Sequence, residues 1–465
     1  MAAPYIVSSW RVWNSSLSNH NQFIFKRIKT MKAILLDGSN LNDKTGERVR
    51  SALTETLQSK GWEVELIVLR DKKIGHCAGD FFCWVRTPGM CNVNDDNREI
   101  SSAIVNSDLM IYLTPVTFGG YSSELKRIVD HQIQNISPFF AKVEGETHHQ
   151  PRYTRYPDFL AIGWMDAPNP RAEAIFRHLA HRNAINFYAL KSTYGLMFAS
   201  QSEAELRTQA ESWLESIKHG TNSLKSTLPE TSLIPIKSAI VPRRAVLLVG
   251  SPRTTKSTSN SLGSYLMDKL AEGDVETEII QVYTSLNSPE KMQLLFDKLD
   301  AADLAVLAFP LYVDNLPAPV IKLLERIAVH RAGHPTQTRF AAIANCGFPE
   351  SAHNATALAI CEEFSRQSGF SWAGSLSLGA GEGLVHGAKI NELKGPASPI
   401  INALDLAAEA LAKGEAIPQA AQGLMAKPFI PGWMYRLVGA FGWNAQAKSW
   451  GAEKLLRRKT YSNPK

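Results

Sequence analysis

The amino-acid sequence predicts an α/β protein in which two doubly wound sheets, each of five parallel strands, follow one another in tandem. Strand-length apolar runs alternate with helix-length segments, and the whole alternation occurs twice in the same order. Strands separated by helices need crossover connections, and such connections produce parallel sheets. A chain of 465 residues is also too long for one ordinary core. We therefore expect two domains with flanking segments.

The first round of this alternation supplies five expected strands and three expected helices. We expect the strands at 32–36, 63–69, 108–113, 159–164 and within 188–199. We expect the helices at 45–60, 124–134 and 171–182. Short apolar runs of this length are typical of strands in a parallel sheet, which is covered on both faces.

The second round repeats the first. Its expected strands are 245–249, 275–282, 303–309, 340–344 and 372–378. Its expected helices are 257–270, 290–299, 318–330 and 352–367. A Gly-Ser pair follows the first strand in both rounds, and a proline follows the third strand in both. A duplicated fold accounts for these shared landmarks.

The domain boundaries follow from the two rounds. We expect an unstructured leader at 1–30, a first domain at 31–217, a linker at 218–243, a second domain at 244–415 and a basic aromatic tail at 416–465. The linker is rich in Ser, Thr and Pro and shows no helical or strand period. The leader contains no acid and several serines, which leaves a targeting segment as the alternative to an unstructured start.

Charge and cysteine content exclude several classes of protein. The formal net charge is +6, but the basic excess lies at the two ends of the chain, so nucleic-acid binding is not expected. No run of about 18 apolar residues occurs that would span a membrane. Five cysteines form an odd set, which argues against a disulfide framework and favours a reducing, cytoplasmic location.

Two loops that follow first strands carry the chemistry of a phosphate site. The second of them, Gly250–Ser259, combines a tight Gly turn, several hydroxyls and the start of a helix, whose free amides and dipole favour an anion. The first loop, 38–46, offers Ser39, Asn40 and Thr45 in comparable places. Ordinary helix capping by Ser and Thr is the alternative interpretation. The second loop is not a Walker A motif, because Thr255 stands where that motif needs glycine.

Two loops that follow third strands favour a flat ring as the ligand. The segments Thr114–Asp130 and Phe309–Glu325 both place proline after an apolar strand, then an aromatic or hydroxyl residue, then a helix. An isoalloxazine ring needs backbone amides for its carbonyls and an apolar face for its rings. An ordinary β–α turn is the alternative. The fourth-strand loops, which begin at Gly163 and Asn345, are expected to close the pocket from the other side.

These motifs resemble a known family. Residues 32–135 are similar to the NAD(P)H-dependent FMN reductase and iron–sulfur flavoprotein group of the flavodoxin-like superfamily, through the Gly-Ser loop, HCAGDFFCWVRTPGMC and TPVTFGGYSSELKRIVDH. Residues 244–383 resemble single-domain flavoproteins of that superfamily, through GSPR with STS and through PLYVDNLPAPV. The resemblance implies flavodoxin-like sheets with strand order 2-1-3-4-5 and FMN as the cofactor.

The resemblance also implies two sets of FMN-binding residues. Those expected to hold the phosphate are Ser39, Asn40 and Thr45 in the first half, or Ser251, Arg253, Ser257 and Ser259 in the second. Those expected to meet the ring are Pro115, Val116, Thr117, Phe118 and Gly119, or Pro310, Leu311, Tyr312 and Val313. The sequence does not decide which half holds FMN.

The chain departs from the family pattern in its cysteine segment. Iron–sulfur relatives carry a cysteine where this chain has Asp80, so Cys77, Cys83 and Cys91 supply three thiolates where a cubane cluster wants four. We therefore do not expect a cluster. A zinc site that adds His76 has the right ligand types but an unusual spacing. Thiols packed near the flavin are the favoured interpretation of these residues. Thr117 and His131 also replace the aromatic and the arginine usual in the family.

The expected function is an FMN-binding oxidoreductase that passes hydride or electrons from NAD(P)H to an unidentified acceptor such as a flavin or quinone. No general acid or base is expected, because the flavin supplies the chemistry. The alternative is a flavodoxin-like electron carrier or scaffold with one or both sites empty. His148 and His149, in a polar insertion at 143–157, are expected to be solvated. The tail after Lys427 suits packing in a homo-oligomer or peripheral contact with an anionic membrane.

Overall fold

The computed structural model describes residues 30–220, 227–229, 240–333, 337–393 and 395–461. The chain from Met31 onward clusters as one compact unit. The expected leader lies outside the described residues, apart from Thr30, and so does most of the expected linker. We call residues 31–217 the first half and residues 244–415 the second half.

The strands of the first half form a parallel sheet that confirms the predicted order. Its strands lie in the order β2-β1-β3-β6-β7, which is 2-1-3-4-5 within the sheet. Their bounds are β1 Lys32–Asp37, β2 Glu63–Val68, β3 Leu109–Pro115, β6 Asp158–Met165 and β7 Ser192–Phe198. Doubly wound sheets of this order bind ligands at the carboxyl ends of their strands, next to the switch between β1 and β3.

The second half repeats the arrangement. The order β9-β8-β10-β11-β12 is again 2-1-3-4-5, and every pairing is parallel. The bounds are β8 Arg244–Val249, β9 Glu276–Gln281, β10 Leu304–Pro310, β11 Arg339–Asn345 and β12 Ser371–Leu378. The third strands run beyond their predicted ends, by two residues in the first half and by one in the second, and both include their proline. The ladder continues there because Val116 N donates to Trp164 O at 2.9 Å and Leu311 N donates to Asn345 O at 2.8 Å.

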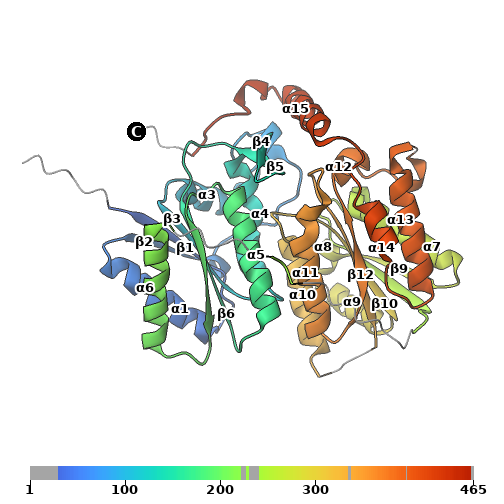
Figure 1. Cartoon of the computed structure of the whole chain (residues 1–465), viewed down its shortest axis with the longest axis horizontal. Helices are drawn as coiled ribbons and strands as arrows, with labels where there is room; N and C mark the ends of the chain where they lie inside the picture. The colour runs from blue at the N-terminus through green and yellow to red at the C-terminus, as the bar shows by residue number, and fades with distance from the viewer. Residues whose placement is uncertain (1–29, 221–226, 230–239, 334–336, 394, 462–465) are drawn as a thin grey trace, which may run out of the picture. The chain divides into compact units, whose positions relative to one another are not determined.

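Helices cover both faces of each sheet (Figure 1). The outer face of the first sheet packs against α1 Lys44–Ser59 and α6 Glu203–His219. The outer face of the second packs against α7 Thr258–Glu272, α13 Ser398–Ala412 and α14 Gln419–Met425. The inner helices are α3 Asn97–Val105, α4 Ser123–His131, α5 Pro170–Asn186, α9 Pro289–Asp300, α10 Ala318–Arg331 and α11 Ala355–Gln367.

The two halves share one hydrophobic core. The inner helices of both sheets belong to a single cluster of buried side chains, in which α4 packs against α10 and α5 packs against α11. Each half also caps a helix of the other. Asp130 accepts from Ala318 N at the start of α10 at 2.9 Å, and Glu325 accepts from Ser123 N at the start of α4 at 2.9 Å. The halves are therefore packed like the subunits of a symmetric dimer joined in one chain.

One prediction about the first half is wrong. The insertion expected as a polar loop with solvated histidines forms an antiparallel hairpin of β4 Ile136–Val143 and β5 Glu146–Pro151. His148 is 1% exposed, and His149 packs against Trp84, Phe140 and Phe348. These partners come from distant parts of the chain, which explains why the local polarity of the segment was misleading.

The C-terminal tail folds back over the ends of both sheets. Helix α15, Gly432–Ser449, crosses above β4 on one side and the short helix α12, Gly381–Leu384, on the other (Figure 1). Two further short helices are α2 Phe82–Val85 and α8 Val282–Ser285. Among the described residues, every helix is too short or too polar to cross a bilayer.

Candidate functional site

The loops after the two third strands have the same backbone shape. In each, two consecutive residues take left-handed conformations: Phe118 (φ 52°) and Gly119 (φ 84°) in the first half, Val313 (φ 49°) and Asp314 (φ 55°) in the second. A bridge closes each turn, from Thr117 to Gly120 and from Tyr312 to Asn315. We call residues 115–121 and 310–316 the first and second ring loops. Their superposable turns place Thr117 and Tyr312 at equivalent positions.

The phosphate loop of the second half, residues 250–259, is lined by hydroxyl groups. Ser257 caps α7 and accepts from Asn260 N at 3.1 Å. Ser259 Oγ accepts from the Asn345 side-chain amide at 2.9 Å. The amides of Thr258 and Ser259 open the helix, where backbone N–H groups have no acceptor within the helix. Small neutral side chains and helix-terminal amides together suit an anion.

Arg253 in this loop is paired within the protein. Its guanidinium donates to both carboxylate oxygens of Glu382 in α12, one of them at 2.6 Å. Burial raises the pKa of Glu382, but hydrogen bonding and the charge of Arg253 outweigh it and lower the pKa overall. The two opposite charges of this ion pair lie beside the loop and neutralise each other. A role for Arg253 in binding a phosphate stays a prediction.

The phosphate loop of the first half, residues 38–46, is already filled by side chains. Asp43 caps α1 by accepting from Gly46 N at 2.8 Å, and its second oxygen accepts from Trp164 Nε1 at 2.9 Å. A Cβ on Gly46 would lie 2.7 Å from Trp164 Cζ2, so the indole rests directly on the helix start. Ser39 Oγ, predicted to hold a phosphate, instead accepts from Arg70 at 2.7 Å.

The residues that differ between the two loops occupy equivalent places. Asp43 and Ser257 are the caps of α1 and α7. Trp164 and Asn345 both pair with the proline that ends the third strand. A carboxylate and an indole in the first half thus stand where the second half has a hydroxyl and a carboxamide. This contrast was not predicted from the sequence, although Asp43 carries a local signal because Asp is a strong helix-cap residue.

A segment of the first half covers the site of the second half. We call residues 75–91 the cysteine loop. Gly79 in this loop has φ 62°, and a Cβ there would collide with Tyr312 Oη and lie 3.7 Å from Pro252 Cγ. The cysteine loop therefore touches both the ring loop and the phosphate loop of the second half. Neither contact was predicted, because it joins residues more than 170 positions apart.

The three cysteines of the cysteine loop are not among the described side chains that lie close enough to share a single ion. Side chains that could share one ion come together, within the described part of the chain, only at Glu146, His148 and His353. Burial raises the pKa of Cys77 to about 12 and raises that of Cys83 as well, so both stay thiols at neutral pH. Cys91 Sγ lies 3.7 Å from His131 Nδ1. Cys77 is close enough to Tyr312 to affect its ionisation, whereas Cys83 packs in the cluster of Trp84 and Ile136.

A buried ion pair of the first half supports the second ring loop. Lys126 is fully buried, is hydrogen-bonded to Asp130, and also donates to Tyr312 O at 2.8 Å. Asp130 in turn accepts from Ala318 N. Burial raises the pKa of Asp130 and lowers that of Lys126, since each charge is out of water and depends on the other. Helix α4 of one half thus holds the backbone of the other half's ring loop.

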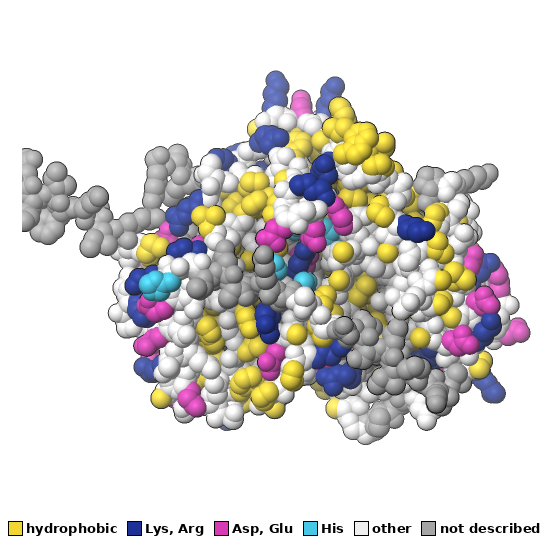
Figure 2. All heavy atoms as spheres, in the orientation of Figure 1, with side chains coloured by type: hydrophobic (Ala, Val, Ile, Leu, Met, Phe, Trp, Pro, Cys, Tyr) yellow, Lys and Arg dark blue, Asp and Glu magenta, His cyan; other side chains and the backbone are white. Residues whose placement is uncertain are grey.

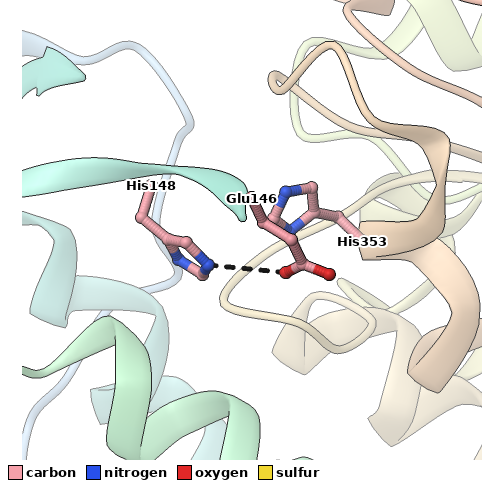
Figure 3. Close-up of side chains that lie close together, drawn as sticks. All are labelled: Glu146, His148 and His353. Carbon is pink, nitrogen blue, oxygen red and sulfur yellow. Dashed lines mark ion pairs between the residues drawn. The ribbon is translucent and has the colours of Figure 1, made fainter. Parts of the chain in front are cut away.

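A second polar network lies behind the same ring loop. Arg182 donates to Asp314 at 3.1 Å, to His353 Nδ1 at 2.7 Å and to Glu146. Figure 3 shows His148 and Glu146 pointing toward one another, with His353 entering from the second half. The Arg182 guanidinium is hydrogen-bonded to two members of this group, Glu146 and His353. The cluster is therefore a hydrogen-bonded charge network, and it fixes the turn that contains Asp314.

A cavity of about 250 Å³ opens beside the cysteine loop. His76 from the first half and Tyr283, Lys322 and Arg326 from the second are among its lining residues, which include no acid. Tyr283 Oη is buried and has no hydrogen-bond partner among the described residues. Burial, followed by the charges of Arg127 and Lys322, lowers the pKa of His76 to about 4. The cavity is a neutral-to-basic recess with an unsatisfied hydroxyl.

Two doubly wound sheets with ring loops and phosphate loops at their strand ends define a flavodoxin-like protein. The model of the family described as NADPH-dependent FMN reductase matches residues 31–145 and 243–365, together about half of the chain. The chain therefore belongs to the NADPH-dependent FMN reductase family.

The similar proteins are distant. An iron–sulfur flavoprotein of Methanocaldococcus jannaschii is 37% identical over 101 residues, which make 22% of this chain and 51% of that protein. One of Archaeoglobus fulgidus is 28% identical over 103 residues, 22% of this chain and 46% of that protein. The chain thus spans about half the length of these curated relatives. An NAD(P)H:quinone oxidoreductase structure from Methanothermobacter marburgensis has 14% identity and a TM-score of 0.25, covering 39% of this chain and 98% of that one.

Proposed function

We propose that this chain is an FMN-binding oxidoreductase that takes electrons from NAD(P)H, and that FMN binds in the second half only. The observation that carries the proposal is the contrast between the two phosphate loops. The second loop presents hydroxyls and helix-terminal amides, whereas Asp43 and Trp164 fill the first. A carboxylate at a helix start repels a phosphate dianion and already uses the anion-binding amides.

In this proposal each loop of the second half has a distinct task. The amides of Thr258 and Ser259, with the hydroxyl of Ser251, hold the phosphate, and Ser257 supports them as the cap of α7. The second ring loop, with Pro310, Leu311, Tyr312 and Val313, meets the edge of the ring. Bound FMN supplies the hydride-accepting chemistry. The cysteine loop excludes water from above the ring loop, and Lys126 keeps the Tyr312 backbone in place.

The cavity beside the cysteine loop supports NAD(P)H as the electron donor. Lys322 and Arg326 supply positive charge to a lining that includes no acid, and Tyr283 Oη offers an unused hydrogen bond. These features suit the phosphates of a nicotinamide dinucleotide. The acceptor remains a flavin, a quinone or a similar small molecule in this proposal, and association into homo-oligomers stays a prediction.

Spectroscopy of the purified full chain tests the proposal. We expect flavin absorbance with one FMN per chain, and bleaching of that absorbance on anaerobic addition of NADPH or NADH. The variant Lys322→Gln with Arg326→Gln is expected to raise the KM for the nicotinamide by about tenfold and to leave kcat nearly unchanged, since it removes binding that is uniform along the reaction.

Each alternative has its own outcome in the same experiment. Bound flavin that stays oxidised with both nicotinamides would indicate an electron carrier that does not react with NAD(P)H. Protein that takes up no FMN would leave a scaffold. Two FMN per chain would contradict the assignment to the second half.

A further inference from the structure

We propose that the outward face of helix α15 docks the protein on an anionic phospholipid surface. The proposal is independent of the flavin, because it rests on the helix, its anchoring and its charge. The helix lies along the top of the molecule in Figure 1, above β4 and α12. It is not a membrane span, so contact with lipid would be in the plane of the interface.

The inward face of α15 is fixed to both halves. The Tyr435 hydroxyl donates to Gly347 O, and the rings of Tyr435 and Phe140 lie 5.7 Å apart. Trp443 packs edge-on against Trp84 with ring centroids 5.3 Å apart, and Ala447 is buried. Positions 435, 443 and 447 are eight and four residues apart, close to whole helical turns, which places them on one side of the helix. The opposite side is consequently held away from the protein.

That opposite side is an exposed apolar stripe. The exposed fractions are 58% for Trp433, 54% for Leu437, 61% for Val438 and 76% for Phe441, with Met434 beside them. Spacings of three, four and one residue make these side chains one continuous strip. Large apolar side chains are seldom left in water as a contiguous group, and such groups mark sites of contact with another surface. Here the group covers more than two turns of one helix.

The chain segment that carries the stripe is mostly basic. No acid occurs between Glu415 and Glu453, whereas Lys427, Arg436 and Lys448 lie in that interval. Lys454, Arg457, Arg458 and Lys459 follow it. Figure 2 shows hydrophobic and basic side chains gathered together at the top of the molecule, over α15 and the residues after it. Aromatic and aliphatic residues flanked by lysine and arginine are the pattern that binds anionic headgroups and inserts between them.

A second copy of the chain fits this face less well. A two-fold interface brings the same patch of both subunits together. Here it would place two basic segments against each other with one acid, Glu453, available from each. An anionic bilayer instead complements the charge and accepts the apolar stripe. We therefore commit to lipid as the occupant.

Flotation of the full chain with vesicles tests the proposal. We expect binding to phosphatidylcholine vesicles that contain phosphatidylserine and little binding to phosphatidylcholine alone. Trp433→Ser with Phe441→Ser should lower the partition coefficient at least about tenfold, because both apolar insertions are lost. Lys448→Gln with Lys454→Gln should lower it by several-fold and reduce its salt dependence. The matched control is Leu190→Ser with Val329→Ser, which removes two side chains that are each 78% exposed elsewhere.

Circular dichroism and thermal unfolding of each variant show whether the fold is intact. Binding that is equal for the wild type, the stripe variant and the control would overturn the proposal, as would absence of binding to both kinds of vesicle. Light scattering adds a further outcome. A wild-type dimer that becomes a monomer only in the Trp433→Ser with Phe441→Ser variant would assign the stripe to a second copy and also overturn the proposal.

Discussion

The two phosphate loops of this chain share a fold position but not a chemistry. In the second half a serine caps the helix and a carboxamide closes the strand end. In the first half an aspartate caps the helix and an indole closes the strand end. Either set makes a stable helix start, because Asp and Ser are both good caps. The difference teaches that two residue types can stabilise a helix start equally well and yet give it opposite preferences for an anion.

The two ring loops differ in a second way: the first ring loop packs against apolar side chains of the other half, Phe364 and Ile360, whereas the second is also hydrogen-bonded from the other half. Lys126 and the cysteine loop reach from the first half to Tyr312. Asp314, next along that loop, is held by Arg182 of the first half. In the proposed arrangement, the second half provides the binding loops and the first half supports them, so that each chain has one FMN site. The predictions below test this division of labour, from the largest effect to the smallest.

The largest effect is expected from Lys126→Ala, which leaves Asp130 buried without its partner. Removing one member of a buried ion pair costs about 3–5 kcal/mol in the free energy of unfolding. Because the pair lies in the shared core, we expect one cooperative transition at lower denaturant, measured by fluorescence and by circular dichroism together. The control Lys413→Ala breaks an exposed pair with Glu409 and should change little. Two separate transitions would show that the halves fold independently.

The next effect concerns the phosphate loops directly. Ser257→Asp gives the second loop the cap of the first and is expected to weaken FMN binding about a hundredfold, roughly 3 kcal/mol, by placing a carboxylate beside the phosphate. The neutral cap in Ser257→Asn should keep the affinity within about threefold. Titration of apoprotein with FMN, followed by quenching of flavin fluorescence, measures both. Unchanged affinity of Ser257→Asp for FMN would show that the phosphate does not bind in this loop.

A smaller effect concerns the β4–β5 hairpin of the first half, which has no counterpart among the described residues of the second half. Burial lowers the pKa of His149 to about 3. An unfolded histidine titrates near 6.5, so the stability held by the neutral ring is complete above about pH 6.5 and is lost as the pH falls toward 3. His149→Phe keeps an aromatic ring and removes the titration. Between pH 7 and pH 5 the unfolding free energy of the wild type should therefore decrease more than that of His149→Phe, by up to about 2 kcal/mol.

Chemical denaturation across that pH range provides the measurement. His219→Gln, which removes an imidazole whose side chain is 72% exposed, is the control. If the wild type and His149→Phe showed parallel pH profiles, the pKa of His149 would not be lowered by burial and the prediction would be wrong.

The sheets were predictable because their signals are local. Apolar runs and helix-length segments set the ten strands and their parallel order, and every predicted strand overlaps an observed one. The ring loops and phosphate loops could likewise be located, because they directly follow strands in the sequence. What each loop binds could not be read in the same way.

The decisive contacts join distant residues. Asp43 and Trp164 are 121 positions apart, and Lys126 and Tyr312 are 186 apart. The hairpin was misjudged for the same reason, since residues as polar as His148 are buried only when partners such as Asn186 and Glu146 surround them. Asp43 alone carried a visible signal as a helix cap, and its consequence depended on where Trp164 lies.

The smallest effect is expected at Asp43 itself. Asp43→Ala removes a helix cap and the acceptor for Trp164 Nε1, and should cost about 1 kcal/mol of unfolding free energy. Asp43→Ser restores the cap and should recover most of that loss. Flavin content should stay at one per chain in both variants, because the indole of Trp164 still covers the helix start. Loss of flavin would place FMN in the first half, whereas a second equivalent of flavin in Asp43→Ser would show that the carboxylate alone closes the first loop.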